Sequence, residues 1–163
     1  MTASTCIFAT LVIGIVATLF MDLWSALLRC LGIATLDFAM LGRWAGHLFQ
    51  GQWRHESIGR ARAVRHERAW GWAIHYAVGV AFAAVLLGVQ GSRWLDSPTL
   101  AAALTLGLVT ALVPLCVMQP AMGAGFFAAR TPTPTRNCLR SVMTHGVFGL
   151  GLYMGALAVG RGI

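Results

Sequence analysis

Three ionisable side chains, Asp22, His75 and His145, lie inside stretches of sequence that are otherwise apolar. A charged group in hydrocarbon is unfavourable, so such a residue usually faces the interior of a helix bundle and has a function there. Histidine has an unperturbed pKa of about 6.5, so it can take up a proton or bind a metal at physiological pH. A neighbouring aspartate orients an imidazole and favours its charged form. We therefore expect an Asp/His polar site within the apolar part of the chain.

Four apolar segments must position these residues. Of the 163 residues, 58% are hydrophobic and only 10% are charged, whereas about a quarter are charged in soluble domains. The segments are about as long as a helix that crosses a bilayer, and they cover residues 6–28, 69–89, 99–118 and 141–159. No Lys or Arg precedes the first, so we expect a retained helix rather than a signal peptide. The predicted fold of residues 1–163 is a single all-α integral membrane domain, a four-helix transmembrane bundle.

The ionisable residues fall at a similar depth in this bundle. The first helix ends, and the second and fourth begin, on the same side, so Asp22, His75 and His145 come level with one another. Gln119 joins them from the end of the third helix. Positions four residues away on the same helix faces are small, which favours close helix contacts. One interpretation is a shared polar site, and the other is separate hydrogen bonds to neighbouring helices.

Arginine is distributed unevenly along the chain. All twelve basic residues are Arg, and only Arg93 and Arg161 lie outside the two long connections. The other ten lie in or beside the connections between helices one and two and between helices three and four. Because basic residues accumulate in cytoplasmic loops, we expect both connections in the cytoplasm and both termini outside. Three of the four cysteines then lie at or near the reducing side, so no structural disulfide is expected.

The first connection, residues 29–68, is too long for a simple turn. Between residues 36 and 49 its apolar residues recur at helical spacing, which predicts an amphipathic helix in the headgroup region or a helix packed under the bundle. Its second half interleaves Arg with Trp and His. Basic residues beside a membrane each gain about 1 kcal/mol from anionic lipid, so the expected partner is the bilayer. The candidate headgroup or phosphate contacts are Arg43, Arg54, His55 and Arg62. No nucleic-acid-binding fold accompanies the charge, and no nucleic acid is expected.

Metal binding is a weaker hypothesis, and the cofactor stays open. Zinc or iron asks for three or four His and carboxylate ligands, and the residues that could supply them are Asp22, Glu67, His75 and His145. No H-E-x-x-H or C-x-x-C motif occurs. Haem between the two intramembrane histidines would have little room, because the glycines near both favour close helix contacts. Soft ligands for copper are also present at the end of the third helix, in Cys116, Met118 and Met122.

The end of the third segment contains Pro120, followed by glycines at 123 and 125. Proline has no backbone donor and restricts the residue before it, so we expect the third helix to end or break there. The glycines allow two continuations. Residues 119–125 either form a re-entrant stretch that lines a polar cavity or form a plain loop.

Six short motifs occur in order along nearly the whole chain, and they are MDLW at 21–24, GRWAGH at 42–47, RHES at 54–57, GWAIHY at 71–76, MQPAMG at 118–123 and THGVFG at 144–149. Together they resemble a family of bacterial inner-membrane proteins, the domain of unknown function numbered twenty-nine thirty-eight. The resemblance implies a four-helix protein of the bacterial inner membrane. In that membrane, the arginine distribution predicts that both termini are periplasmic. It implies no activity for any residue.

Three classes of function fit these observations. The first is a transporter-like protein, as a homo-oligomer because four short helices enclose little volume, with Asp22 and the histidines as a proton-coupled or cation site. The second is a membrane enzyme acting on a lipid or small metabolite, with a His as general base and Arg43 or Arg54 binding a phosphate. The third is a non-catalytic subunit of a membrane complex. The sequence leaves the cargo, the substrate and any enzymatic activity open.

Overall fold

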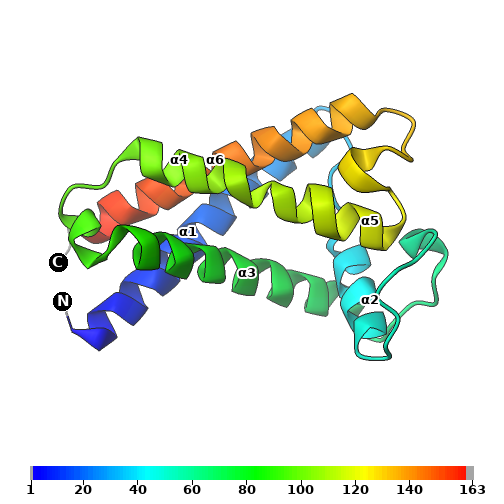
Figure 1. Ribbon diagram of the computed structural model, residues 1–163, viewed down its shortest axis with the longest axis horizontal. Coiled ribbons are helices and arrows are strands. Elements are labelled where there is room, and N and C mark those ends of the chain that lie inside the picture. The colour runs from blue at the N-terminus through cyan, green and yellow to red at the C-terminus, as the bar shows by residue number, and fades with distance from the viewer. Residues whose placement is uncertain (1, 161–163) are drawn as a thin grey trace. The chain divides into compact units, whose positions relative to one another are not determined.

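The computed structural model describes residues 2–160, and within them all regular secondary structure is helical, with no β-strand. Six α-helices follow one another, and their bounds are α1 Ala3–Cys30, α2 Phe38–Leu48, α3 Glu67–Gln90, α4 Leu100–Thr110, α5 Gln119–Met122 and α6 Pro134–Gly160 (Figure 1). Short 3-10 turns lie at Ile58–Arg60, Ser92–Asp96 and Phe126–Ala128, and a π-helical stretch lies at Pro114–Met118. The all-α prediction is confirmed.

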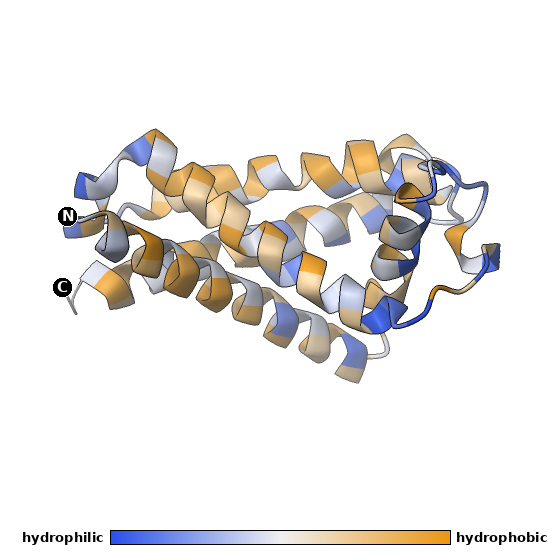
Figure 2. Ribbon diagram, turned by 90° about the horizontal axis from the view of Figure 1, so that it is seen from below, coloured by the Kyte–Doolittle hydropathy of each residue, from blue (hydrophilic) through white to orange (hydrophobic). Residues whose placement is uncertain are grey.

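Four stretches are long and apolar enough to cross a membrane: Ala3–Cys30, Glu67–Gln90, Leu100–Met122 and Pro134–Gly160. Each contains nearly all of a segment predicted from the sequence, and hydrophobic residues run along these helices in Figure 2. The fourth begins seven residues earlier than its apolar segment, at Pro134 rather than at 141. Hydropathy marks only the apolar part of a helix, whereas a helix can begin in polar sequence, and proline is favoured in its first turn.

The third stretch is less regular than predicted. Regular α-helix is interrupted at Ala111, resumes at residues 112–113 and passes into the π-helical stretch. Pro120 then lies in the first turn of α5, where a missing N–H is tolerated. The helix ends instead at Gly123, whose φ of 100° is in the left-handed region that glycine adopts without strain. The third helix therefore does not end at Pro120, because a proline in a first turn does not stop a helix. It is instead interrupted just before Pro120, by the π-helical stretch that precedes α5.

The described chain forms two compact units. Unit 1 lies within residues 1–33, 76–110 and 143–163, and unit 2 lies within residues 34–75 and 111–142. Unit 1 therefore contains α1, most of α3, α4 and most of α6. Unit 2 contains α2, the first residues of α3, the π-helical stretch, α5 and the start of α6.

Small residues allow the helices of unit 1 to pack closely. A Cβ added to Gly14 of α1 would lie 2.5 Å from the Cα of Val80 in α3. One added to Gly107 of α4 would lie 2.5 Å from the Cα of Gly149 in α6. Such contacts replace the hydrophobic drive where the surroundings are themselves apolar. Large apolar residues are instead turned outward on α1 at four-residue steps, and they are Ile7, Leu11, Ile15, Leu19, Leu23 and Leu27.

In unit 2, glycines hold α2 against the start of α3. A Cβ added to Gly42 would meet the carbonyl oxygen of Glu67, and one added to Gly71 would meet the carbonyl oxygen of Phe38. Asp37 caps α2 by accepting a hydrogen bond from the N–H of Ala39 at 2.9 Å. The predicted helix between residues 36 and 49 is thereby confirmed as α2. Its place relative to a membrane stays a prediction.

Candidate functional site

Asp22 of α1 accepts a hydrogen bond from the hydroxyl of Tyr76 on α3, with 2.8 Å between the Tyr76 Oη and an Asp22 carboxylate oxygen. Both residues belong to unit 1 and are partly buried. The register between the helices explains the pairing, because Gly79 approaches the side chain of Thr18 closely. One turn further along, where the antiparallel helices run past each other, Asp22 meets Tyr76. Tyr76 was not among the predicted site residues, although it directly follows His75 in the sequence.

A second polar contact in unit 1 joins α4 and α6. His145 Nδ1 lies 2.9 Å from the hydroxyl oxygen of Thr110. That hydroxyl donates its single proton to the carbonyl of Gly107 at 2.6 Å. The hydroxyl oxygen is therefore the acceptor for His145, which places a proton on Nδ1 and, in the neutral ring, leaves a lone pair on Nε2.

The other two residues of the predicted polar site belong to unit 2. The ring of His75 packs against Phe38, with 4.3 Å between the ring centroids, and lies near Trp72. The side-chain oxygen of Gln119 is buried and accepts no hydrogen bond within the described chain. The hydrogen bonds of Asp22 and His145 described above go to different partners, so the shared site stays a prediction.

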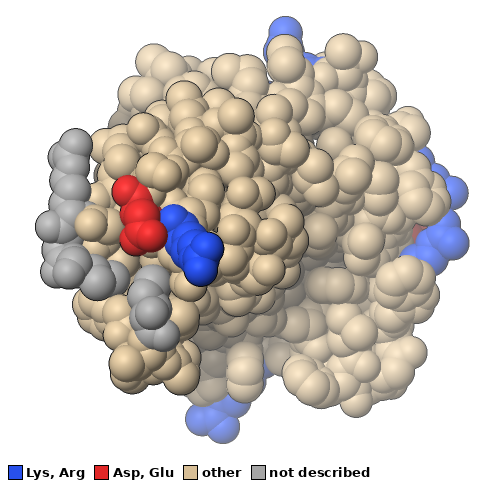
Figure 3. Space-filling model, turned by 60° about the vertical axis from the view of Figure 1, so that its left-hand side comes forward, with Lys and Arg blue, Asp and Glu red and all other residues tan. Residues whose placement is uncertain are grey.

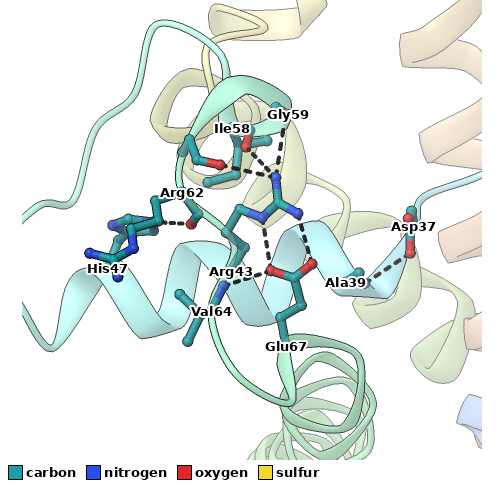
Figure 4. A network of polar contacts seen from close by, with 10 residues as sticks. Asp37, Ala39, Arg43, His47, Ile58, Gly59, Arg62, Val64 and Glu67 are labelled. Carbon is teal, nitrogen blue, oxygen red and sulfur yellow. Dashed lines mark hydrogen bonds and ion pairs between the residues drawn. The ribbon is translucent and has the colours of Figure 1, made fainter.

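Arg43 of α2 forms the densest polar network of unit 2 (Figure 4). Its guanidinium donates to both carboxylate oxygens of Glu67, at 2.8 and 2.7 Å. It also donates to carbonyl oxygens of the long connection, those of Ile58, Gly59 and Ala61, at 3.2–3.3 Å. The Glu67 carboxylate further accepts the N–H of Val64 at 3.0 Å. The pKa of Arg43 is raised by this hydrogen-bonded carboxylate. Arg43 therefore fastens the connection to α2 and α3.

Two histidines converge in unit 2. His47, near the end of α2, and His55, in the long connection, are each 7% exposed, and their ring centroids are 4.9 Å apart at an interplanar angle of 70°. His47 Nε2 lies 2.9 Å from the carbonyl oxygen of Arg62. The backbone N–H of His55 donates to Ala121 at 2.8 Å, but both of its ring nitrogens are buried without a hydrogen-bond partner. Burial and the neighbouring His47 lower the pKa of His55, against a smaller upward effect of the Ala121 carbonyl.

The candidate headgroup contacts occupy different environments. Arg54 and Arg62 are exposed, Arg43 is committed to the network above, and the ring of His55 is buried. Exposed aromatic residues accompany the arginines of unit 2, with Phe49 88%, Trp53 56% and Trp70 55% exposed. By contrast, few charged side chains lie on the face of the molecule that Figure 3 shows. Arginine beside exposed aromatic rings is typical of a surface at a membrane interface.

Within residues 2–160, no three or more His, Cys, Asp and Glu side chains are grouped so that they could hold a metal ion. The weak metal candidates Asp22, Glu67, His75 and His145 therefore do not form such a cluster. Glu67 is engaged by Arg43 and Val64, and Asp22 by Tyr76. The arrangement of unit 1 instead suits the binding or transfer of a proton or small cation at a carboxylate.

The sequence model of one protein family matches residues 11–159, and its description reads "Protein of unknown function (DUF2938)". The match covers most of the first apolar stretch, nearly all of the fourth, and everything between them. Neither a search of curated proteins nor a search of solved structures returned a match.

Proposed function

The chain belongs to the DUF2938 family of proteins of unknown function, and from this premise we propose that it handles a proton or small cation within a bacterial inner membrane, at a polar site built on Asp22. The hydrogen bond from Tyr76 to Asp22 carries the proposal. It places a carboxylate with a titratable neighbour between two helices that are long and apolar enough to span a bilayer. Ionisable groups at such positions typically mark ion pathways and proton relays.

The chemistry of the pair fits reversible binding. A carboxylate can accept a proton or coordinate a cation, and the Tyr76 hydroxyl donates a hydrogen bond to one of its oxygens. His145 adds a second ionisable side chain in unit 1, in contact with the Thr110 hydroxyl through Nδ1. His75 and Gln119 belong to unit 2, and their place at the same membrane depth stays a prediction from the sequence.

The orientation is also part of the proposal. Nine of the twelve arginines belong to unit 2, which spans both long connections. We place both long connections in the cytoplasm, with the exposed arginines among their residues on anionic headgroups, and both termini in the periplasm. Reporter insertions at the exposed turns of Gly51 and Gly91 should report opposite sides, and a periplasmic signal at Gly51 would reverse the orientation.

Reconstitution in liposomes tests the activity. A trapped pH-sensitive dye should report proton flux under an imposed potential, and sodium or potassium should be varied to identify a coupled cation. We expect Asp22→Asn to abolish the flux and Tyr76→Phe to reduce it. Asp96→Asn is the matched control, since Asp96 lies in the connection between α3 and α4.

The outcomes separate the function classes. Flux that is unchanged in Asp22→Asn and Asp96→Asn alike would overturn the proposal. Turnover of an added lipid by the same preparation would favour a membrane enzyme, and a stoichiometric partner retained during purification would favour a complex subunit. Native mass spectrometry of the preparation measures whether the active form is a homo-oligomer.

A further inference from the structure

We propose that His47 and His55 form a binding site for a first-row transition-metal ion, with Zn²⁺ as the first candidate. The proposal concerns unit 2 and does not depend on proton or cation handling at Asp22. It rests on three observations: the convergence of the two rings, the hydrogen bond that orients one of them, and the unsatisfied nitrogens of the other.

The two rings come together at a distance that suits a shared ion. Zinc–nitrogen bonds of about 2 Å at a tetrahedral angle place two imidazole centroids about 5 Å apart. The centroids of His47 and His55 are 4.9 Å apart. Imidazole is a preferred ligand of zinc, copper and nickel, whereas magnesium and calcium prefer oxygen. The pair therefore selects a transition metal over the abundant hard cations.

The hydrogen bond of His47 prepares it as a ligand. The Arg62 carbonyl oxygen, 2.9 Å from Nε2, can only accept, so Nε2 carries a proton. In the neutral ring this leaves the lone pair on Nδ1. Metal-ligating histidines almost always donate their other ring N–H in this way, commonly to a backbone carbonyl, which orients the ring and raises its basicity.

His55 supplies the second lone pair and the reason for a ligand. Its ring nitrogens are buried without partners in the described chain, and a buried polar atom left unpaired is destabilising. One nitrogen of a neutral ring is an acceptor, and a metal bond would satisfy it. The alternative to a metal site is an edge-on contact between two aromatic rings, which would leave both nitrogens of His55 unsatisfied.

The surrounding backbone holds His55 in place. Its N–H donates to Ala121, and Gly123 approaches the carbonyl oxygens of His55 and Glu56 so closely that a Cβ would collide with them. The two histidines provide two protein ligands, since the described residues contain no cluster of three His, Cys, Asp and Glu side chains. Water or an exogenous ligand would fill the remaining positions, as at catalytic zinc sites, which keep an open position.

Calorimetric titration of the tag-free, chelator-treated full-length protein in detergent tests the site, with Zn²⁺ alone as the probe and Mg²⁺ as the comparison. We expect one Zn²⁺ per chain and no Mg²⁺ binding. His47→Phe and His55→Phe keep an aromatic ring and should each weaken Zn²⁺ binding by at least about 10-fold. His66→Asn is the matched control, because His66 is exposed and its φ of 59° is one that asparagine tolerates.

A second measurement needs no variant and covers the case in which a substitution prevents folding. X-ray absorption at the zinc edge of the wild-type complex should show two imidazole ligands with zinc–nitrogen distances of about 2.0 Å. Absence of Zn²⁺ binding would overturn the proposal. So would binding that neither phenylalanine variant weakens relative to His66→Asn, or a zinc spectrum without two imidazoles.

Discussion

The two units share close glycine contacts but differ in how their polar side chains are hydrogen-bonded. In unit 1, each interhelical side-chain hydrogen bond described above joins one side chain to one other, as Tyr76 to Asp22. Unit 2 joins them into a network in which Arg43 contacts a carboxylate and three carbonyl groups. Regular helices satisfy their own backbone groups, whereas an irregular connection needs partners from side chains. The difference therefore follows from how much of each unit is regular helix.

We expect the largest loss of stability from substitutions at the close glycine contacts, which both units contain. A Cβ at Gly42 would meet the backbone of Glu67 in unit 2, and one at Gly107 would meet the backbone of Gly149 in unit 1. Backbone cannot move aside as the end of a flexible side chain can. We expect Gly42→Val and Gly107→Val each to lower the free energy of unfolding by more than about 4 kcal/mol, measured by denaturant titration in micelles.

Gly88 provides the matched control for these substitutions, since it lies in α3 and a Cβ there would meet nothing within 4 Å. Gly88→Ala should leave stability unchanged or raise it by up to about 1 kcal/mol, because alanine is the better helix former. If Gly42→Val were as well tolerated as Gly88→Ala, the close approach of α2 and α3 would be wrong.

The next largest effect should come from the network of unit 2. Arg43→Met removes the guanidinium and leaves the Glu67 carboxylate and three carbonyl groups without it, so we expect a loss of about 2–4 kcal/mol, below the full value for a completely buried pair. Arg43→Lys should not restore the stability, because a single ammonium cannot replace the planar fork.

Arg54→Met tests whether the loss of any arginine lowers the stability as much as Arg43→Met, since Arg54 is exposed. Its stability should stay within about 0.5 kcal/mol of the wild type. Equal losses in Arg43→Met and Arg54→Met would remove the distinction between a networked and a solvated arginine.

We expect a smaller loss of stability from substitutions at the Asp22–Tyr76 hydrogen bond of unit 1. In a double-mutant cycle, Asp22→Asn and Tyr76→Phe should show a coupling of about 0.6–1.7 kcal/mol, as for other hydrogen bonds between membrane helices. A cycle of Asp22→Asn with His145→Ala asks whether the unit holds one polar site or two. Coupling above about 0.5 kcal/mol would support the shared site, and simple additivity would leave separate pairs.

The smallest effect is a pH dependence of unit 2. The pKa of His55 is lowered from its ordinary value, so the unfolded state binds more protons than the folded state as the pH falls below about 6.5. Stability should therefore be complete at about pH 8 and decline toward about pH 5.5. His55→Phe should flatten this decline in the thermal unfolding midpoint, measured without added metal, while His66→Asn should preserve it. An identical decline in both variants would assign it to other groups.

Much of the helical architecture could be predicted from the sequence because it depends on local pattern. An apolar run of sufficient length specifies a membrane-spanning helix whatever it packs against, and the periodicity between residues 36 and 49 specified α2 in the same way. The irregular geometry before α5 could not be predicted, since a proline is compatible with a helix end, a kink or a first turn. The surrounding backbone decides among them.

The sequence by itself determined that Asp22, His75 and His145 lie in apolar helices and that the arginines gather in two connections. Only the tertiary structure decided their neighbours. The Gly79–Thr18 contact sets the register that brings Tyr76 to Asp22. The backbone hydrogen bond from His55 to Ala121 holds His55 where its ring contacts that of His47. Hydropathy is a property of each residue alone, whereas hydrogen bonding depends on the distance and orientation of two groups, which packing sets.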